Sequence, residues 1–401
     1  MLRRWRRILA ASLCGLCLLG ATHGARLLPL DILFNGASRP DDVVETLSHF
    51  DRLTPVAMVK RSGPVSTLPV RAAPFPAIRF EDRGDSFDLH DYLATNRVAG
   101  LLVLKNGEIA LEDYELGFGP QSRWASFSVA KSIASTLAGA AIRDGHIRSI
   151  DDPVDHYVPA LKSGAYAGVS IRNILTMSSG VAWDETYTDP KSDRRKLLAL
   201  QLFHRPGDVL RYMNGLGRAA PQGTLWHYST GETYVLGAVI EGATHRPLAH
   251  YLSEKIWAPA GMESDATWWQ ESPGGMGLAG GGLTATLRDY GRFGLIAENG
   301  GKVAGRPIVP DGWFAEAGAP HMIGGKKQDY GFMWWMPTTA APLDAGAFEA
   351  VGIFGQFIYV NPAEHVVIVV LSARSKPSNV GHSMLDDDAF FSAVVKALHD
   401  Q

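Results

Sequence analysis

Residues 128–142 constrain the fold of this chain more than any other stretch. From Ser132 onward nearly every residue is apolar or small, and Ile133, Leu137 and Ala141 recur at helical spacing. This pattern predicts a helix that begins near the start of the stretch and ends by Gly145. Because the helix has little polar surface, we expect it to be buried inside a large core.

Ser128 and Lys131 lie at the start of this predicted helix, one turn apart on the same face. A serine is a poor nucleophile until a base removes its proton, and lysine is a base only when neutral. With a pKa near 10.4, roughly one lysine in 2,500 is neutral at pH 7. Burial in the apolar helix would lower that pKa, and a shift of about three units costs about 4 kcal/mol. By itself the spacing also fits a helix N-terminus with one exposed lysine.

Residues 1–25 are predicted to be an export signal, with a basic start at Arg3, Arg4, Arg6 and Arg7 and an apolar run over 8–20. Small residues follow without a clean cleavage site, so an uncleaved anchor remains an alternative. We expect a periplasmic or secreted protein, bound to a membrane only if the leader is retained.

Both cysteines lie within this leader, so the mature chain has no thiol for catalysis or metal binding. The leader carries four arginines and no acidic residue, and its removal lowers the formal charge from −3 to −7. This charge gives no basic surface for nucleic acid. The whole chain is 46% hydrophobic, and the part that remains after the leader is long enough for a large core.

Sheet-forming sequence lies towards both ends of the chain, and helical sequence lies between. Asn-Gly at 106–107 joins two apolar runs, 100–104 and 109–114, which predicts a hairpin. A second hairpin is predicted for 355–371. Helices are predicted for 88–95, 149–154, 170–177, 191–203, 233–243, 246–258, 287–298 and 384–398.

These elements predict an α+β fold: one antiparallel sheet built from both ends of the chain, flanking helices, and an inserted, mostly helical lobe at roughly 145–300. Prolines interrupt every periodic run from 26 to 86, which predicts an irregular N-terminal arm before a domain at 87–401. A ligand site is expected in the cleft between the sheet and the lobe.

A serine–lysine pair needs a third group to carry the proton to the leaving atom, and Tyr228 is the candidate. A phenol near cations is expected to share its proton more readily than its free pKa of about 10 suggests. The alternative is an ordinary half-buried tyrosine before a helix. His227 is a weaker candidate base, because alternation along the chain would point it away from the tyrosine side.

Three short motifs, at 128–131, 228–230 and 352–356, resemble the active-site elements of the class C β-lactamase family of serine hydrolases, and they occur in the same order. The connecting stretches 174–180 and 281–290 agree, and the resemblance covers roughly residues 85–400. Within the family the sequence is most similar to nylon-oligomer (6-aminohexanoate-dimer) hydrolases, through residues 184–187. The resemblance implies a β-lactamase/transpeptidase-like fold.

The resemblance also implies roles for individual residues. Ser128 would be the acylated nucleophile, Lys131 its base and Tyr228 the relay that protonates the leaving group. The backbone N–H groups of Ser128 and Ile353 would form the oxyanion hole. Tyr187 would donate a hydrogen bond to the substrate from the rim.

Two positions depart from the β-lactamase pattern. Residues 350–352 are Ala-Val-Gly where β-lactamases of this class have Lys-Thr-Gly, so the cation that helps to hold the drug carboxylate is missing. Gly352 is kept, as close backbone approach requires, and Gly355 is the second candidate substrate-contacting glycine. Thr230 replaces the usual asparagine. These changes weaken the case for penicillin recognition and leave acyl transfer intact.

Three functions therefore remain: an exported esterase or amidase acting on small or linear substrates; a D,D-peptidase or β-lactamase; and a catalytically silent envelope-binding protein. No Gly-x-Ser-x-Gly elbow, His-Glu-x-x-His motif, phosphate loop or dinucleotide fingerprint occurs. We therefore expect neither a metal nor a cofactor. The tryptophan pairs at 268–269 and 334–335 are predicted to pack in the core or to line an apolar acyl pocket.

Overall fold

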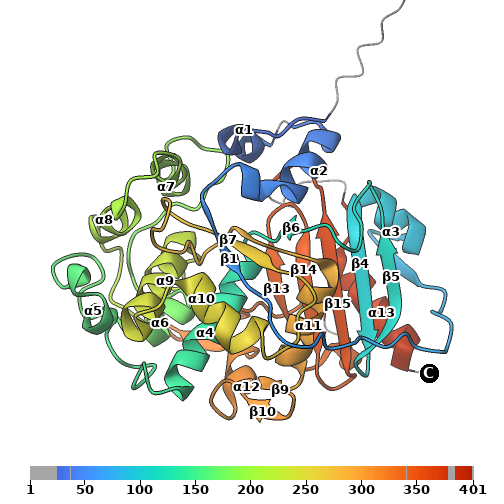
Figure 1. The fold of residues 1–401 in the computed structure, drawn as a ribbon. Coiled ribbons are helices and arrows are strands. Elements are labelled where there is room, and N and C mark those ends of the chain that lie inside the picture. Colours follow the sequence, from blue (N-terminus) through green and yellow to red (C-terminus); the bar gives the residue numbers. More distant parts are fainter. Residues whose placement is uncertain (1–24, 37, 340, 378–383, 400–401) are drawn as a thin grey trace, which may run out of the picture.

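The computed structural model describes residues 25–399 except 37, 340 and 378–383. A five-stranded sheet forms one side of the molecule, and a mainly helical region forms the other (Figure 1). The predicted export signal, apart from Ala25, lies outside the described residues. In the part of the chain that the structure describes, no helix has both the length and the apolar character needed to cross a membrane.

The main sheet joins strands from both ends of the described chain, as the sequence predicted. Its strands follow the order β13-β14-β15-β4-β5, and every neighbouring pair is antiparallel. Their bounds are β4 Val98–Lys105, β5 Glu108–Tyr114, β13 Phe348–Gly352, β14 Gln356–Asn361 and β15 Val366–Ser372. The predicted Asn-Gly turn joins β4 to β5, with a left-handed φ at both residues.

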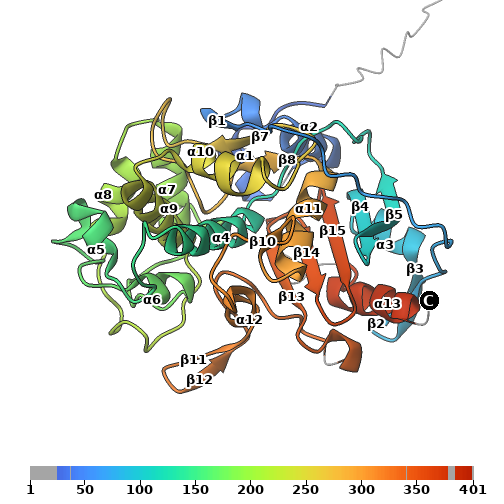
Figure 2. The ribbon, with the colours of Figure 1, turned by 60° about the horizontal axis from the view of Figure 1, so that its bottom comes forward.

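Both faces of this sheet are buried, which explains why its strands read as nearly continuous apolar runs. In β15 the side chains alternate: Val367, Val369 and Leu371 pack into the larger core, whereas Ile368 and Val370 pack into a second core. Helices α11 (Leu287–Glu298) and α4 (Val129–Arg143) cover the first face, and α3 (Leu89–Thr95) and α13 (Asp387–His399) cover the second (Figures 1 and 2).

The helical region surrounds α4 and α9, which pack against each other. Its elements are α5 Val154–Tyr157, η2 Pro159–Leu161, α6 Ile171–Leu175, α7 Asp193–Leu202, α8 Asp208–Asn214, α9 Thr230–Thr244, α10 Leu248–Leu252 and a π-helical turn, η3, at Ser253–Trp257. Helices α6, α7, α9 and α10 confirm the predicted positions, and α10 continues into η3 across the predicted 246–258. The predicted 149–154 is not helical apart from Val154, the first residue of α5, and neither η2 nor α8 was predicted.

Helix α11 lies within the range 145–300 predicted for the helical lobe, yet it packs against β4, β14 and β15. Gly291 and Gly294 allow this close approach, because a Cβ at Gly294 would lie 2.4 Å from Val367 Cγ1. The helical region therefore ends before α11.

After α11 the chain forms β9 Lys302–Val303, β10 Arg306–Pro307, α12 Trp313–Ala317, β11 His321–Ile323, β12 Lys326–Gln328 and η4 Pro342–Asp344.

The N-terminal arm at 26–86 is not irregular throughout, which corrects the sequence prediction. It contains α1 Leu30–Asn35, α2 Pro40–Ser48, η1 Phe50–Arg52, β1 Val56–Val59, β2 Arg79–Asp82 and β3 Asp85–Asp88. The prolines misled the prediction because Pro29 and Pro40 start helices rather than interrupt them.

A second sheet ties this arm to the rest of the molecule. Strand β1 pairs with β7 (Ala266–Trp269), which continues through β8 (Leu283–Ala285) to β6 (Trp124–Ala125). This sheet was not predicted, because its strands are short and their partners are far away in the sequence. Strand β6 ends three residues before Ser128, so the second sheet positions the candidate nucleophile.

Candidate active site

Ser128 lies at the junction between β6 and α4, where the chain changes from strand to helix. It is the N-cap residue of α4, so the helix begins where the sequence predicted. Ser126 anchors the junction by donating its N–H to Leu283 O at 3.0 Å. Phe127 makes the turn with a φ of 45°, a left-handed conformation that costs a non-glycine residue roughly 1–3 kcal/mol. Surrounding packing has to hold this strained turn in place.

Lys131 is buried directly beneath the serine, with 1% of its surface exposed. Its Nζ lies 2.7 Å from Ser128 Oγ and donates to Gly280 O at 2.8 Å. The pKa of Lys131 is lowered to about 7, mainly because the amine is buried; the Glu185 carboxylate opposes this shift and Arg194 adds to it. The predicted lowering is confirmed, and a substantial fraction of the lysine is neutral near pH 7. A neutral amine can use its lone pair to accept the serine proton.

Tyr228 lies beside this pair, with Lys131 Nζ 5.2 Å from the centre of its ring, and it borders the same pocket as Ser128. The expected easier loss of its proton is wrong, because burial raises the pKa of Tyr228 well above 10. A lysine that is partly neutral supplies little positive charge to offset that burial. Tyr228 is therefore a neutral phenol, able to donate a hydrogen bond and to pass a proton on. His227 borders the same pocket but is exposed.

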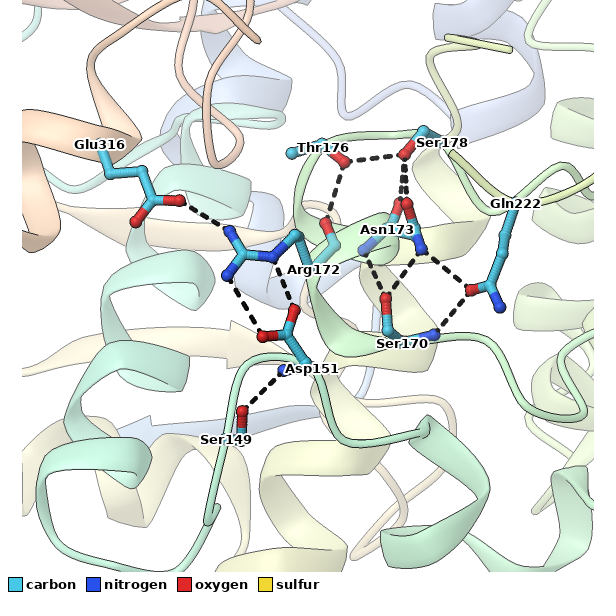
Figure 3. Close-up of polar contacts among 9 residues, drawn as sticks. All are labelled: Ser149, Asp151, Ser170, Arg172, Asn173, Thr176, Ser178, Gln222 and Glu316. Carbon is cyan, nitrogen blue, oxygen red and sulfur yellow. Dashed lines mark hydrogen bonds and ion pairs between the residues drawn. The ribbon is translucent and has the colours of Figure 1, made fainter. Parts of the chain in front are cut away.

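A polar network of side chains surrounds the turn that follows α6 (Figure 3). Ser178 Oγ donates to Asn173 Oδ1 at 2.9 Å, and Asn173 Nδ2 donates to Gln222 Oε1 at 2.9 Å. These contacts fix the turn after α6, where Met177 O accepts the N–H of His227 at 2.8 Å. The residue just before the tyrosine is therefore tied to a turn that side chains brace.

The turn between β13 and β14 brings Ile353 to the pocket. Phe354 and Gly355 have φ values of 66° and 84°, which reverse the chain within three residues. Gln356, fully buried, donates to Ile353 O at 3.3 Å and accepts from Trp124 Nε1 at 2.9 Å. This side chain connects the turn to the strand that leads to the nucleophile, a role that the motif at 352–356 did not predict.

Both backbone N–H groups predicted for the oxyanion hole are available to a ligand. Among the described residues, neither the N–H of Ser128 nor that of Ile353 has an acceptor, and both residues border one pocket. Gly352 lies close by, and a Cβ there would lie 2.2 Å from Ser126 O, which confirms the predicted need for close backbone approach. A Cβ at Gly355 would lie 2.4 Å from Arg374 Nε.

The pocket has a volume of about 630 Å³ and mostly aromatic and aliphatic walls. The lining residues are Ser128, Glu185, Tyr187, Trp226, His227, Tyr228, Trp335, Val351, Gly352, Ile353 and Pro377. Of the predicted tryptophan pairs, Trp335 lines the pocket, whereas Trp268, Trp269 and Trp334 are buried in the core. None of the described lining residues is Lys or Arg.

Glu185 is a site residue that the sequence analysis did not identify. Its carboxylate accepts from Trp183 Nε1 and from both the N–H and the hydroxyl of Thr230, so Thr230 supports the carboxylate. Tyr187 borders the same pocket as Glu185 and forms part of its wall. The only sequence signal for Glu185 was that it lies in the stretch 184–187, which also contains Tyr187.

The missing β-lactamase lysine leaves an apolar position. Ala350 is fully buried in the core, so it brings no charge to the pocket. In the described part of the chain, no cluster of three or more His, Cys, Asp or Glu residues is arranged to hold a metal ion.

Residues 90–390, about three quarters of the chain, match the β-lactamase family. The chain belongs to the β-lactamase family. Across 345 residues it is 29% identical to the 6-aminohexanoate-dimer hydrolase of Paenarthrobacter ureafaciens, a match that covers 81% of this chain and 84% of that protein. Because its family consists of serine hydrolases, this β-lactamase-family protein is a serine hydrolase.

Solved structures show the same fold. A putative 6-aminohexanoate-dimer hydrolase from Bacillus anthracis superposes with a TM-score of 0.78 at 24% identity, covering 90% of this chain and 95% of that one. A family VIII carboxylesterase superposes with a TM-score of 0.58 at 14% identity, covering 78% and 96%. The fold of this β-lactamase-family protein is thus shared with proteins named as a 6-aminohexanoate-dimer hydrolase and a carboxylesterase.

Glu232 provides a pH-dependent test of the packing of α9, the helix that follows Tyr228 in the chain. It is 2% exposed, and burial raises the pKa of its carboxyl to about 8. The unfolded chain has a carboxyl pKa near 4.5, so the folded protein holds the extra proton between about pH 4.5 and 8. The stability from that proton is complete below pH 4.5 and is lost as the pH rises through 8. We expect Glu232→Gln to gain stability relative to wild type as the pH rises from 5 to 9.

Chemical denaturation at unit pH steps would measure this difference. Glu115→Gln, at an exposed carboxylate, is the matched control and should keep a constant offset from wild type. A constant offset for Glu232→Gln as well would contradict the prediction.

Proposed function

We propose that this protein is an exported hydrolase that cleaves ester or amide bonds of small or linear substrates through an acyl-enzyme on Ser128. One observation carries the proposal: Lys131 is buried with its Nζ 2.7 Å from Ser128 Oγ and with a pKa lowered to about 7. A lysine in such a place has little structural value, because burying it costs free energy. It is well suited to activating a hydroxyl, which argues against a silent binding protein.

In the proposed reaction, Ser128 Oγ attacks the substrate carbonyl carbon while its proton moves to Lys131 Nζ. The carbonyl oxygen becomes an oxyanion that accepts hydrogen bonds from the N–H groups of Ser128 and Ile353. When the bond to the leaving group breaks, the Tyr228 hydroxyl gives its proton to the leaving nitrogen or oxygen and recovers one from the Lys131 ammonium. Water then attacks the acyl-enzyme by the reverse sequence of proton transfers, releasing the acid and regenerating Ser128.

Two observations support linear esters or amides over β-lactams and cell-wall peptides. Ala350 is buried and uncharged, so the pocket lacks the lysine that would help to hold a drug or peptide carboxylate. The aromatic walls formed by Trp226, Trp335 and Tyr187 suit an apolar acyl or alkyl chain. Relatives named for 6-aminohexanoate dimers and carboxylic esters are consistent with this substrate class.

We expect Ser128→Ala to abolish turnover of p-nitrophenyl acetate and butyrate, because no other nucleophile replaces the hydroxyl. Lys131→Ala should lower kcat by about 10³-fold or more, since general-base help is worth about 10²–10⁴-fold and the lysine also returns the proton.

The wild-type protein should not hydrolyse nitrocefin. A fluorophosphonate should add once, at Ser128, as seen by mass spectrometry of the intact protein and its peptides.

Ser135→Ala is the matched control, because Ser135 is a buried serine on the same helix and lies outside the pocket. It should retain activity and labelling. Near-wild-type turnover in Lys131→Ala would remove the lysine from the mechanism, and turnover of nitrocefin would favour the β-lactamase alternative.

The acid limb of the pH profile should report Lys131. Because only the neutral amine accepts the serine proton, kcat/KM should rise about tenfold per pH unit below pH 7 and level off above it.

The Glu185 carboxylate raises the pKa of Lys131, so Glu185→Gln should move the midpoint of this kcat/KM profile to lower pH. Asp184→Asn, at the exposed neighbouring carboxylate, should leave it unchanged. A midpoint that stays fixed in Glu185→Gln would argue against this coupling.

Export is proposed from residues 1–25 alone. Expression of the full chain in a Gram-negative host should give a periplasmic protein that begins after the small-residue stretch at 20–25. Fractionation and N-terminal sequencing would test this, and an intact N-terminus in the membrane fraction would indicate a retained anchor.

A further inference from the structure

Phe34 connects the N-terminal arm to the back of the candidate active site. It lies in α1 with 1% of its surface exposed. Its ring contacts Phe127 edge-on at 6.2 Å, Phe354 edge-on at 6.3 Å and Tyr187 at 6.1 Å between centroids. One side chain of the arm therefore touches three separate segments that form the pocket.

Two of these contacts are next to the proposed oxyanion donors. Phe127 directly precedes Ser128, and Phe354 directly follows Ile353. Both phenylalanines have left-handed φ values, 45° and 66°, and their rings contact each other at 5.2 Å. Non-glycine residues keep such conformations only where surrounding packing imposes them, and Phe34 packs on both rings.

Helix α1 is itself held firmly. The guanidinium of Arg194, 4% exposed, lies 4.8 Å from the centre of the Phe34 ring. The adjacent Arg195 donates to Asn35 Oδ1 at 2.8 Å and to Tyr187 O at 3.1 Å. These contacts join α1 to α7 and to the tyrosine in the pocket wall, so the ring of Phe34 has a fixed position.

We propose that Phe34 is a positioning residue that sets the relative placement of the two oxyanion-hole N–H groups by packing on Phe127 and Phe354. It lies outside residues 90–390, so the arm contributes to the reaction although it precedes the family match. The inference rests on the proposed function, because it assumes that the N–H groups of Ser128 and Ile353 stabilise an oxyanion.

Phe34→Ala and Phe34→Leu should be assayed with p-nitrophenyl butyrate and titrated with butylboronic acid, which forms a tetrahedral adduct on serine with an oxygen in the oxyanion hole. We expect kcat to fall about 10- to 100-fold in Phe34→Ala, because small misplacements of catalytic donors have effects of this size. KM should change little, boronate affinity should fall with kcat, and Phe34→Leu should lose less. The midpoint of the acid limb of the kcat/KM pH profile should stay at the wild-type value, because Phe34 does not contact Lys131.

Phe390→Ala and Phe390→Leu are the matched controls. Phe390 is fully buried among Phe80, Tyr92 and Phe391 on the opposite face of the sheet. These variants should lose stability while keeping kcat and boronate affinity.

The inference is overturned if the Phe34 variants lose no more kcat and boronate affinity than the Phe390 variants. If Phe34→Ala does not fold, the comparison of Phe34→Leu with Phe390→Leu decides the question in the same way. Failure of the proposed function would appear separately in the wild type, as absent fluorophosphonate labelling at Ser128 and absent boronate binding.

Discussion

The contact between the buried Lys131 amine and the Ser128 hydroxyl is the interaction on which the rest of the site depends. Packing around α4 excludes water, and Gly280 O accepts one N–H so that the amine is not left without a partner. Its hydrogen-bond partners among the described residues are neutral, whereas a direct carboxylate partner would keep the lysine charged. Glu185 is near enough to affect its pKa, but that carboxylate is held by Trp183 and Thr230.

The site is assembled from segments that are far apart in the sequence. The nucleophile follows β6, and Tyr228 precedes α9. Lys131 donates a hydrogen bond to Gly280 O, in the segment before β8. Ile353 comes from the turn between β13 and β14, and buried Gln356 ties that turn to β6 through Trp124. The antiparallel pairing of β15 with β4 brings the two ends of the chain together, so closure of the main sheet is a condition for the site to exist.

Local signals predicted well wherever a residue's own neighbours decide its structure. The Asn-Gly hairpin, the 355–371 hairpin and the helix after Ser128 formed as expected, because turn residues and apolar spacing act over a few positions. The N-terminal arm was predicted poorly. Pro40 starts a helix, and β1 gains its stability from β7, more than 200 residues away. Glu185 was missed because nothing local shows that Thr230 and Trp183 will surround it.

The sequence by itself determined which chemical groups are present: a serine and a lysine one helical turn apart, a tyrosine before a helix, and an alanine where β-lactamases carry a lysine. It also determined the α+β fold, through two hairpins with helical sequence between them. Only the tertiary structure decided the state of those groups. The pKa of Lys131 and the neutral phenol of Tyr228 depend on burial, and burial depends on chain segments that meet only when the molecule folds. The role of the arm behind the pocket has the same origin, because aromatic contacts between Phe34, Phe127 and Phe354 leave no pattern along the chain.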